Sequence, residues 1–275
     1  MSTISRHLIL RSLVCSSLLL ASGLGVADAG SGDPQAAYHG EFVYDARMAF
    51  IRAGQLRLHL KRDGDAYEVA GHFKTSRAMS TYYTWNGVFA AVGTWQGFGP
   101  VTTAYMSRTS GKDDDLKIVL TYPTSTRVLD GPDEEFETVD RPGGIDLISA
   151  LFFNPGCYRG GQVHDGEDAY QLTLRQEKKR ELRRRAGYYS GPVLSCDYGV
   201  VDHKGRKRRV QVSLAEVNGH MVAVQVRARI PLLPDAIFHL RTPPAEAVAQ
   251  TATAGSGNPA AKALPQLTQA PVSSD

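Results

Sequence analysis

Apolar and polar residues alternate along most of the chain between residues 38 and 242. Leu56, Leu58 and Leu60, for example, are separated by single polar residues. A period of two sends successive side chains to opposite faces of a strand, so it predicts half-buried β-strands. The pattern recurs roughly ten times and does not alternate with helical patterns, which favours antiparallel pairing. We therefore predict an all-β fold, either one strongly curved antiparallel sheet or a barrel of lipocalin type.

Glycine-containing turns set the expected strand pairing. Asp63-Gly64 is read as a two-residue hairpin turn, which would place Leu60 opposite Tyr67 and keep the apolar residues on one face. A two-residue turn at Asn218-Gly219 would instead split the apolar face of its hairpin. We therefore predict a three-residue loop or a bulge there, with Gly219 near the left-handed region.

Only two short helices are expected. One covers residues 76–84. The other covers residues 147–153, where Asp146 is a suitable N-cap and Asn154-Pro155-Gly156 a stop. The apolar residues of this second segment favour packing on a sheet over a cofactor site.

The two ends of the chain differ in composition from the strand region. Residues 1–29 read as a secretory signal, with two arginines, an apolar stretch and the cleavage pattern Ala27-Asp28-Ala29. We expect export to the periplasm and no membrane span after cleavage. A short segment, 30–37, then precedes a β domain at 38–242. Residues 243–275 contain no aromatic residue and predict a disordered tail.

Two cysteines remain once the signal, with Cys15, is removed. In an oxidising compartment Cys157 and Cys196 most simply form a disulfide, and two buried free thiols are the alternative. Their spacing is not that of a redox-active Cys-x-x-Cys pair.

Charge is unevenly distributed although the whole chain has a formal net charge of only +3. Residues 113–140 are acidic and residues 174–209 are strongly basic. The basic part is either a solvated face or a surface for anionic lipid, polysaccharide or an acidic partner. Nucleic acid is excluded by the compartment and by the lack of interleaved aromatics. The candidate surface comprises Lys178, Lys179, Arg180, Arg183, Arg184, Arg185, Arg206, Lys207, Arg208 and Arg209.

Aromatic residues gather within one short stretch. They form either ordinary core or an apolar lining for lipid chains or sugar rings. The five are Tyr82, Tyr83, Trp85, Phe89 and Trp95.

No motif predicts catalysis, a cofactor or a metal. The histidines do not show metalloprotease spacing, and His164-Asp165 reads as a turn. Cys196 with His203 lacks a third, orienting group. The acidic residues Asp133, Glu134, Glu135 and Glu137 are more typical of a solvated loop.

Four segments resemble the exported bacterial proteins grouped as domain of unknown function 3108. They are residues 41–56, residues 144–153 (GIDLISALFF), residues 165–174 and residues 191–196. That family is similar in plan to antiparallel lipid-carrier barrels such as the lipoprotein-localisation carriers. The resemblance implies an envelope location and a lipoprotein-carrier-like fold. It implies no activity.

Together these observations favour a non-catalytic binding module for an apolar or anionic lipid-type ligand, without a cofactor. An anionic envelope polymer is another possible ligand. An envelope assembly or scaffold factor that binds another protein is the alternative, and a hydrolase of envelope polymers is the least favoured.

Overall fold

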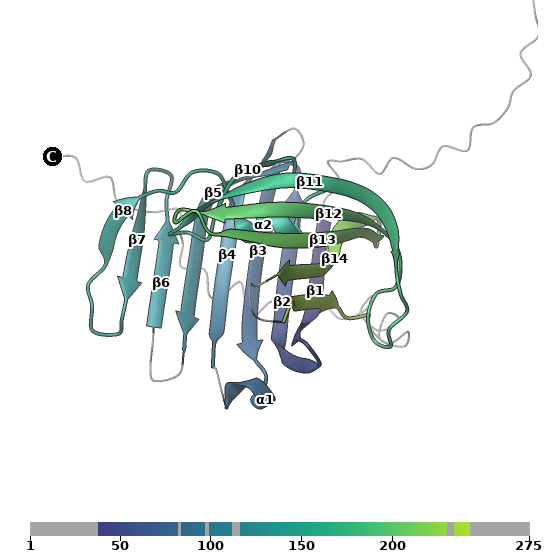
Figure 1. Ribbon diagram of the computed structural model, residues 1–275. Helices are drawn as coiled ribbons and strands as arrows, with labels where there is room; N and C mark the ends of the chain where they lie inside the picture. Colours follow the sequence, from purple (N-terminus) through teal and green to yellow (C-terminus); the bar gives the residue numbers. More distant parts are fainter. Residues whose placement is uncertain (1–37, 82–83, 97–98, 112–115, 230–233, 243–275) are drawn as a thin grey trace, which may run out of the picture. The chain divides into compact units, whose positions relative to one another are not determined.

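The computed structural model describes residues 38–81, 84–96, 99–111, 116–229 and 234–242. Within these ranges, fifteen strands form one hydrogen-bonded sheet and are accompanied by two short helices (Figure 1). In chain order the elements are β1 (Tyr38–Met48), β2 (Ile51–Asp63), β3 (Ala66–Thr75), α1 (Arg77–Ser80), β4 (Asn86–Gln96), β5 (Gly99–Ser110), β6 (Leu116–Thr121), β7 (Ser125–Asp130), β8 (Glu137–Asp140), β9 (Ile145–Asp146), α2 (Leu147–Phe152), β10 (Gly160–His164), β11 (Ala169–Leu182), β12 (Gly191–Asp202), β13 (Lys207–Val217), β14 (His220–Arg229) and β15 (Ala236–Leu240).

The strand order confirms the all-β, strongly curved sheet. The sheet extends from β1 to β8 on one side and from β15 back to β9 on the other, so that β1 and β15 are neighbours. All its strand pairs are antiparallel except β9 with β10, which is parallel. The expectation of purely antiparallel pairing is therefore wrong at this point. β9, α2 and β10 make a strand–helix–strand step too short to appear as an alternating pattern.

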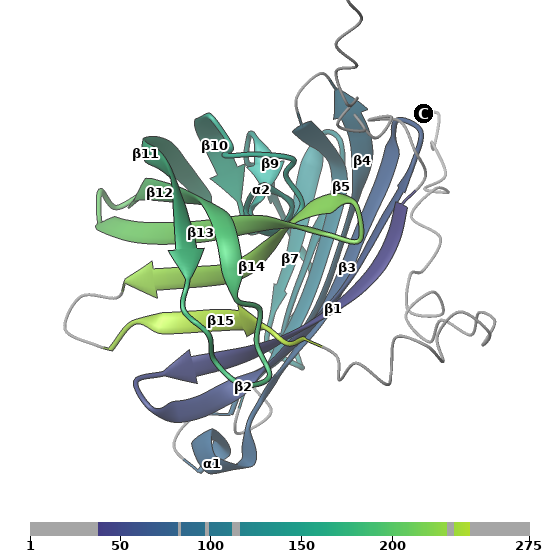
Figure 2. The same ribbon diagram turned by 90° about the vertical axis from the view of Figure 1, so that its right-hand side faces the viewer.

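The two halves of the sheet diverge from the β1–β15 pair, and α2 lies between them (Figure 2). Phe152 meets Tyr44 of β1 edge to face, with ring centroids 5.2 Å apart. Phe153, directly after α2, contacts Tyr67 at 5.8 Å and Trp95 at 5.2 Å. Phe152 also meets Phe238 of β15 edge to face at 6.4 Å, so this aromatic packing excludes water and joins both halves into one core. The middle of the curved sheet is thus filled with side chains.

The β2–β3 hairpin is found where predicted, but its register is wrong by two residues. Leu60 faces Val69 rather than Tyr67, because the turn residues are Gly64 and Asp65. Gly64 has φ +57°, which glycine adopts without strain. A shift of two leaves every side chain on its face, so the apolar alternation could not distinguish the two registers.

The β13–β14 hairpin has a two-residue turn together with a bulge. Asn218 and Gly219 form a two-residue turn with φ +54° and +80°, typical of type I′. Gly219 therefore has the predicted conformation, but the three-residue loop is wrong. The bulge exists between Ser213 and Leu214, away from the turn, and it restores the pairing of Val212 with Val226.

Both helices occur at their predicted places. The Ser76 hydroxyl caps α1, which is shorter than predicted and ends at Ser80. Asp146 caps α2 by accepting a hydrogen bond from the Ser149 N–H at 2.8 Å. The signal segment 1–29, the segment 30–37 and the tail 243–275 lie outside the described residues. Among the residues described, no helix is both long and apolar enough to span a membrane.

Candidate functional site

The described part of the chain contains a groove of about 940 Å³. It lies beside α2, between the facing ends of β4 and β5 and the strands β11 and β12. Apolar side chains provide most of its wall, and a few polar groups stand among them, as in typical ligand sites. The lining residues are Gln96, Gly99, Pro100, Val101, Gly144, Ile145, Asn154, Pro155, Gly156, Cys157, Tyr158, Arg159, Glu177 and Leu194.

The segment that follows α2 forms one side of this groove, and a disulfide secures it. Cys157 is bonded to Cys196 of β12, with Cα atoms 5.5 Å apart, which confirms the predicted bond. Cys196 lies on the interior face of β12, fully buried. The groove wall is therefore covalently attached to the sheet.

Three of the polar side chains that line the groove, Asn154, Arg159 and Glu177, differ in their contacts. Asn154 is only 5% exposed, and its Nδ2 has no hydrogen-bond partner among the described residues. A buried amide donor without a partner is costly, and a ligand oxygen that reached Nδ2 would satisfy it. Arg159 and Glu177 form an exposed ion pair at 3.8 Å. Exposed pairs contribute little stability, so a ligand charge could separate this one cheaply.

Buried hydrogen bonds join the two halves of the sheet along what we call the seam. Thr102 of β5 donates to Asp146 Oδ2 at 2.6 Å and accepts from the Asp146 N–H at 3.0 Å. Tyr67 shares a 3.0 Å hydrogen bond with the same threonine hydroxyl. Thr121 of β6 donates to the Gly166 carbonyl at 3.1 Å. Side chains thus hold together two parts of the sheet that backbone pairing does not close.

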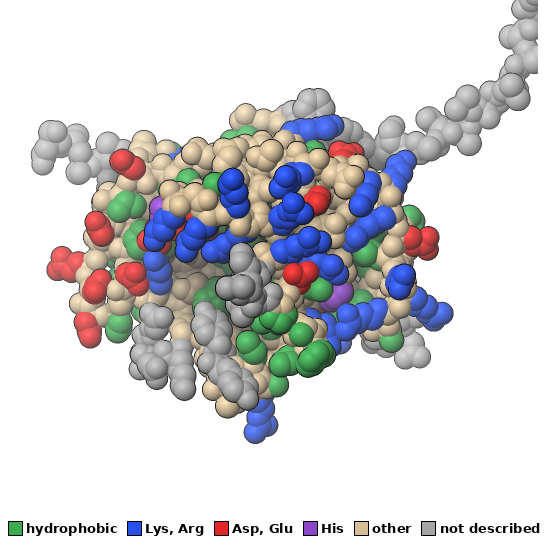
Figure 3. Space-filling view, viewed as in Figure 1, with side chains coloured by type: hydrophobic (Ala, Val, Ile, Leu, Met, Phe, Trp, Pro, Cys, Tyr) green, Lys and Arg blue, Asp and Glu red, His purple; other side chains and the backbone are tan. Residues whose placement is uncertain are grey.

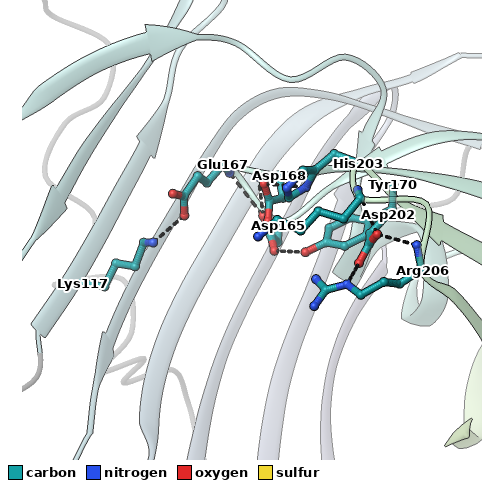
Figure 4. A network of polar contacts seen from close by, with 9 residues as sticks. Lys117, Asp165, Glu167, Asp168, Tyr170, Asp202, His203 and Arg206 are labelled. Carbon is teal, nitrogen blue, oxygen red and sulfur yellow. Dashed lines mark hydrogen bonds and ion pairs between the residues drawn. The ribbon is translucent and has the colours of Figure 1, made fainter. Parts of the chain in front are cut away.

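The turn between β10 and β11 extends this seam with a polar network (Figure 4). Asp165 accepts from the Tyr170 hydroxyl at 2.6 Å and from the N–H of Asp168 at 2.9 Å. Glu167 reaches across to Lys117 of β6 at 2.6 Å. Burial and the hydrogen bond to Asp165 raise the pKa of Tyr170, so its hydroxyl stays protonated. The predicted turn therefore begins at Asp165, directly after His164, the last residue of β10.

His164 itself is completely buried, next to the Tyr105 ring. Its Nδ1 accepts from the Gly166 N–H at 3.1 Å, and burial lowers its pKa. A neutral, enclosed imidazole of this kind positions a turn and has no access to a substrate. No three His, Cys, Asp or Glu side chains come together as a metal site within the described ranges.

The comparison with protein families identifies where this chain belongs. Residues 43–234 match the family described as "Protein of unknown function (DUF3108)". The chain belongs to this family. No curated protein and no solved structure matches it. The match reaches from β1 to the connection before β15, so it includes the groove, the seam and the disulfide.

The segments that carry the DUF3108 resemblance meet around the site. Residues 144–153 form β9 and α2, residues 165–174 form the turn at the seam and the start of β11, and residues 191–196 begin β12. The family pattern therefore includes the elements that hold the two halves together. It also supplies Gly144 and Leu194 to the groove.

The described members of the predicted aromatic cluster, Trp85, Phe89 and Trp95, are not among the residues that line the groove of this DUF3108 chain. Trp95 packs on Phe153 and beneath the Arg62 guanidinium, 4.3 Å from the ring centroid. Phe89 occupies the space that Gly71 leaves by lacking a Cβ. Trp85 lies against Phe73 at 4.8 Å. Tyr82 and Tyr83 lie outside the described residues.

The predicted basic surface separates into two kinds of residue. Lys and Arg side chains gather over β11–β13 in Figure 3. Arg206 is bonded to Asp202 at 2.6 Å. Arg180 and Arg185 instead turn toward the sheet, to Ser213 at 3.0 Å and His239 at 3.4 Å. Nine of the ten residues are exposed: Lys178, Lys179, Arg183, Arg184, Arg185, Arg206, Lys207, Arg208 and Arg209.

Sequence reasoning missed the polar groove residues. Asn154 was predicted only as part of the stop of a helix, and no binding role was predicted for Arg159 or Glu177. The one available signal was the cysteine next to this stop, because a disulfide at Cys157 places its neighbours on the sheet. Cys196 belongs to the disulfide, so no thiol is available to act with His203.

Proposed function

We propose that this protein is an exported, non-catalytic binding protein of the bacterial periplasm, and that its ligand is of lipid type. The observation that carries the proposal is the groove of about 940 Å³, whose wall is largely apolar and includes one unpartnered donor, Asn154 Nδ2. A lipid chain would lie along Pro100, Val101, Ile145 and Leu194. An oxygen of the ligand would accept from Asn154.

The groove is preferred to a central cavity because Phe152 and Phe153 fill the middle of the curved sheet. In a carrier-like protein of this plan, the ligand would therefore lie at the margin of the core. Export rests on the signal-like residues 1–29, and it agrees with a disulfide that persists in oxidising compartments.

A protein-binding role in envelope assembly is the second candidate. Phe50, 87% exposed, and Ile51, 46% exposed, stand next to each other at the β1–β2 turn. Exposed apolar residues of this size favour contact with another protein. A hydrolase is disfavoured, since the acidic residues Asp133, Glu134, Glu135 and Glu137 are exposed and outside the groove lining.

The test is native mass spectrometry of the mature protein, purified gently from a bacterial periplasm. We expect an adduct of lipid mass on the wild-type protein. Gly156→Trp should abolish it, because a Cβ at Gly156 meets nothing within 4 Å and an indole there would occupy the groove.

Val88→Trp is the matched control, because Val88 is exposed on β4 and does not line the groove. This variant should keep the adduct. A wild-type protein that carries no lipid but crosslinks in cells to one dominant protein would contradict the proposal and support the assembly role.

A further inference from the structure

A continuous row of polar side chains crosses five strands on the exterior face of the sheet. Ser195, Ser213, Gln225, His239 and Asp45 are neighbours in register from β12 through β13, β14 and β15 to β1. Each is more than nine-tenths buried. Alternate residues on an exterior face normally face water, so a buried polar row requires something that covers it.

Part of this cover is the connection between β11 and β12, residues 183–190. The Tyr189 N–H donates to the Leu240 carbonyl at 3.1 Å, and the Thr242 N–H donates to the Gly187 carbonyl at 3.1 Å. The connection therefore runs alongside β15, which Figure 2 shows. It brings the Tyr188 hydroxyl to within 3.0 Å of Asp45 Oδ2.

Four arginines complete the cover, and we call Arg47, Arg180, Arg185 and Arg227 the arginine cluster. Arg180 donates to Ser213 at 3.0 Å and to Gln225 at 3.4 Å, and Arg185 lies 3.4 Å from His239. Arg227 of β14 and Arg47 of β1 are both paired in register with Ile237 of β15. They therefore lie in the row of residues next to the polar row, on the same face of the sheet. These four arginines come from four segments of the chain, and Arg47 also donates through Nη2 to the Phe50 carbonyl at 2.8 Å.

The charges around this cluster are not balanced. Asp45 is already held by Arg52 at 2.7 Å and approached by Arg241 at 3.9 Å, and Asp235 lies 3.9 Å from Arg227. Burial and the surrounding arginines lower the pKa of His239 to about 4, so the imidazole is neutral at physiological pH. Among the described residues, six arginines thus surround two carboxylates in a partly desolvated region.

Several donors in the cluster also lack partners. The Nε atoms of Arg47, Arg180 and Arg227 are buried and make no hydrogen bond among the described residues, and neither does the Ser195 hydroxyl. Buried unpaired guanidinium donors are expensive to maintain. An anion with several oxygens would satisfy them, because guanidinium groups bind phosphate through paired hydrogen bonds.

We propose that the arginine cluster is a binding site for a phosphate-type oxyanion, separate from the groove. Arg180, Arg227 and Arg47 bind its oxygens, and Gln225 and the serine hydroxyls complete the site. The phosphate is either free in solution or part of a lipid headgroup. The site is independent of the groove ligand, since Ser195 and the groove residue Leu194 lie on opposite faces of β12.

The test is titration calorimetry of the full mature protein with inorganic phosphate at constant ionic strength. We expect saturable binding with one phosphate per chain. Arg180→Gln and Arg227→Gln should each weaken it at least tenfold. The control Arg183→Gln, an exposed arginine of the same covering connection, should change it less than twofold.

Vesicles distinguish the two sources of phosphate. The ligand is a headgroup if the protein binds vesicles of phosphatidylcholine with phosphatidylglycerol but not vesicles of phosphatidylcholine alone. In that case Arg227→Gln should abolish the binding to the mixed vesicles. If inorganic phosphate binds and these vesicles do not, the ligand is free phosphate. No saturable binding of either probe overturns the proposal, as does an equal loss with Arg183→Gln.

Circular dichroism shows whether each variant is folded. Removing one of several mutually repelling arginines should leave the unliganded protein at least as stable as the wild type. If Arg180→Gln does not fold, Arg185→Gln provides the same test, because Arg185 is more exposed and contacts only His239 and the Tyr188 ring among the side chains that the structure describes.

Discussion

At the scale of single residues, burial rather than residue type decides what the polar groups of this protein do. Asn154, His164 and Ser195 are common polar residues in the sequence, yet each has a buried atom without a partner. His239 lies in the polar row, between the Gln225 amide at 3.3 Å and the Arg185 guanidinium. The same residue in a solvated strand would titrate near its ordinary pKa.

His239 should make the protein less stable in acid. Its pKa is lowered to about 4, chiefly by burial and then by neighbouring arginines, against 6.5 for the free side chain. Between these values the unfolded chain binds a proton that the folded chain does not. The free energy of unfolding should therefore fall as pH decreases from about 6.5 to about 4, by up to about 1.4 kcal/mol per pH unit.

The measurement is urea unfolding of the wild type and His239→Gln across this range. His164 has a lowered pKa as well and contributes with the same sign, so the difference between the two proteins isolates His239. We expect a flatter pH dependence for the variant. Parallel curves would show that His239 is not held neutral by the fold.

At the scale of elements, the segment after α2 is attached to the sheet by the disulfide. It has no regular structure from Asn154 to Tyr158, and it forms one side of the groove. Cys157 within it is bonded to Cys196 of β12. The short helix could be predicted from its cap and stop, whereas the groove wall that follows it could not.

Replacing both cysteines, Cys157→Ser with Cys196→Ser, should lower the free energy of unfolding by about 3–4 kcal/mol, because the bond spans a sequence separation of 39. The measurement is urea unfolding without reductant. Reduced wild-type protein should match the double variant. A variant as stable as the oxidised wild type would mean that packing holds this segment unaided.

At the scale of the whole described sheet, the seam joins the two halves through side chains. In a closed barrel, backbone hydrogen bonds between the edge strands would join them. β8 and β9 are the two edges of the sheet, and they do not pair with each other. Instead Thr102 and Asp146 join β5 to β9 within the core. β6, β7 and β8 extend beyond β5, and β8 is mostly exposed.

A double-mutant cycle should measure this closure. Asp146→Ala removes a charged hydrogen bond and the cap of α2, and Thr102→Val removes its partner with little change of shape. We expect a coupling energy of about 1.5–3 kcal/mol in urea unfolding. The exposed neighbour Thr103→Val should show coupling near zero with Asp146→Ala. Equal coupling for both threonines would contradict the seam.

Much of this protein follows from its sequence alone. The period of two, the glycine turns and the cap at Asp146 are local signals, and they predicted the all-β class, the helix sites and the principal hairpins. The disulfide followed from the number of cysteines and the expected compartment. The family followed from short segments read in combination.

Only the tertiary structure decided the rest, because it depends on register and on contacts between distant strands. A shift of two residues in β2–β3 leaves the alternating pattern unchanged, so pattern could not select the pairing. Likewise, five ordinary polar residues on five strands become one buried row only when those strands align. The groove, the seam and the arginine cluster arise in the same way, from residues that the chain separates and the curved sheet brings together.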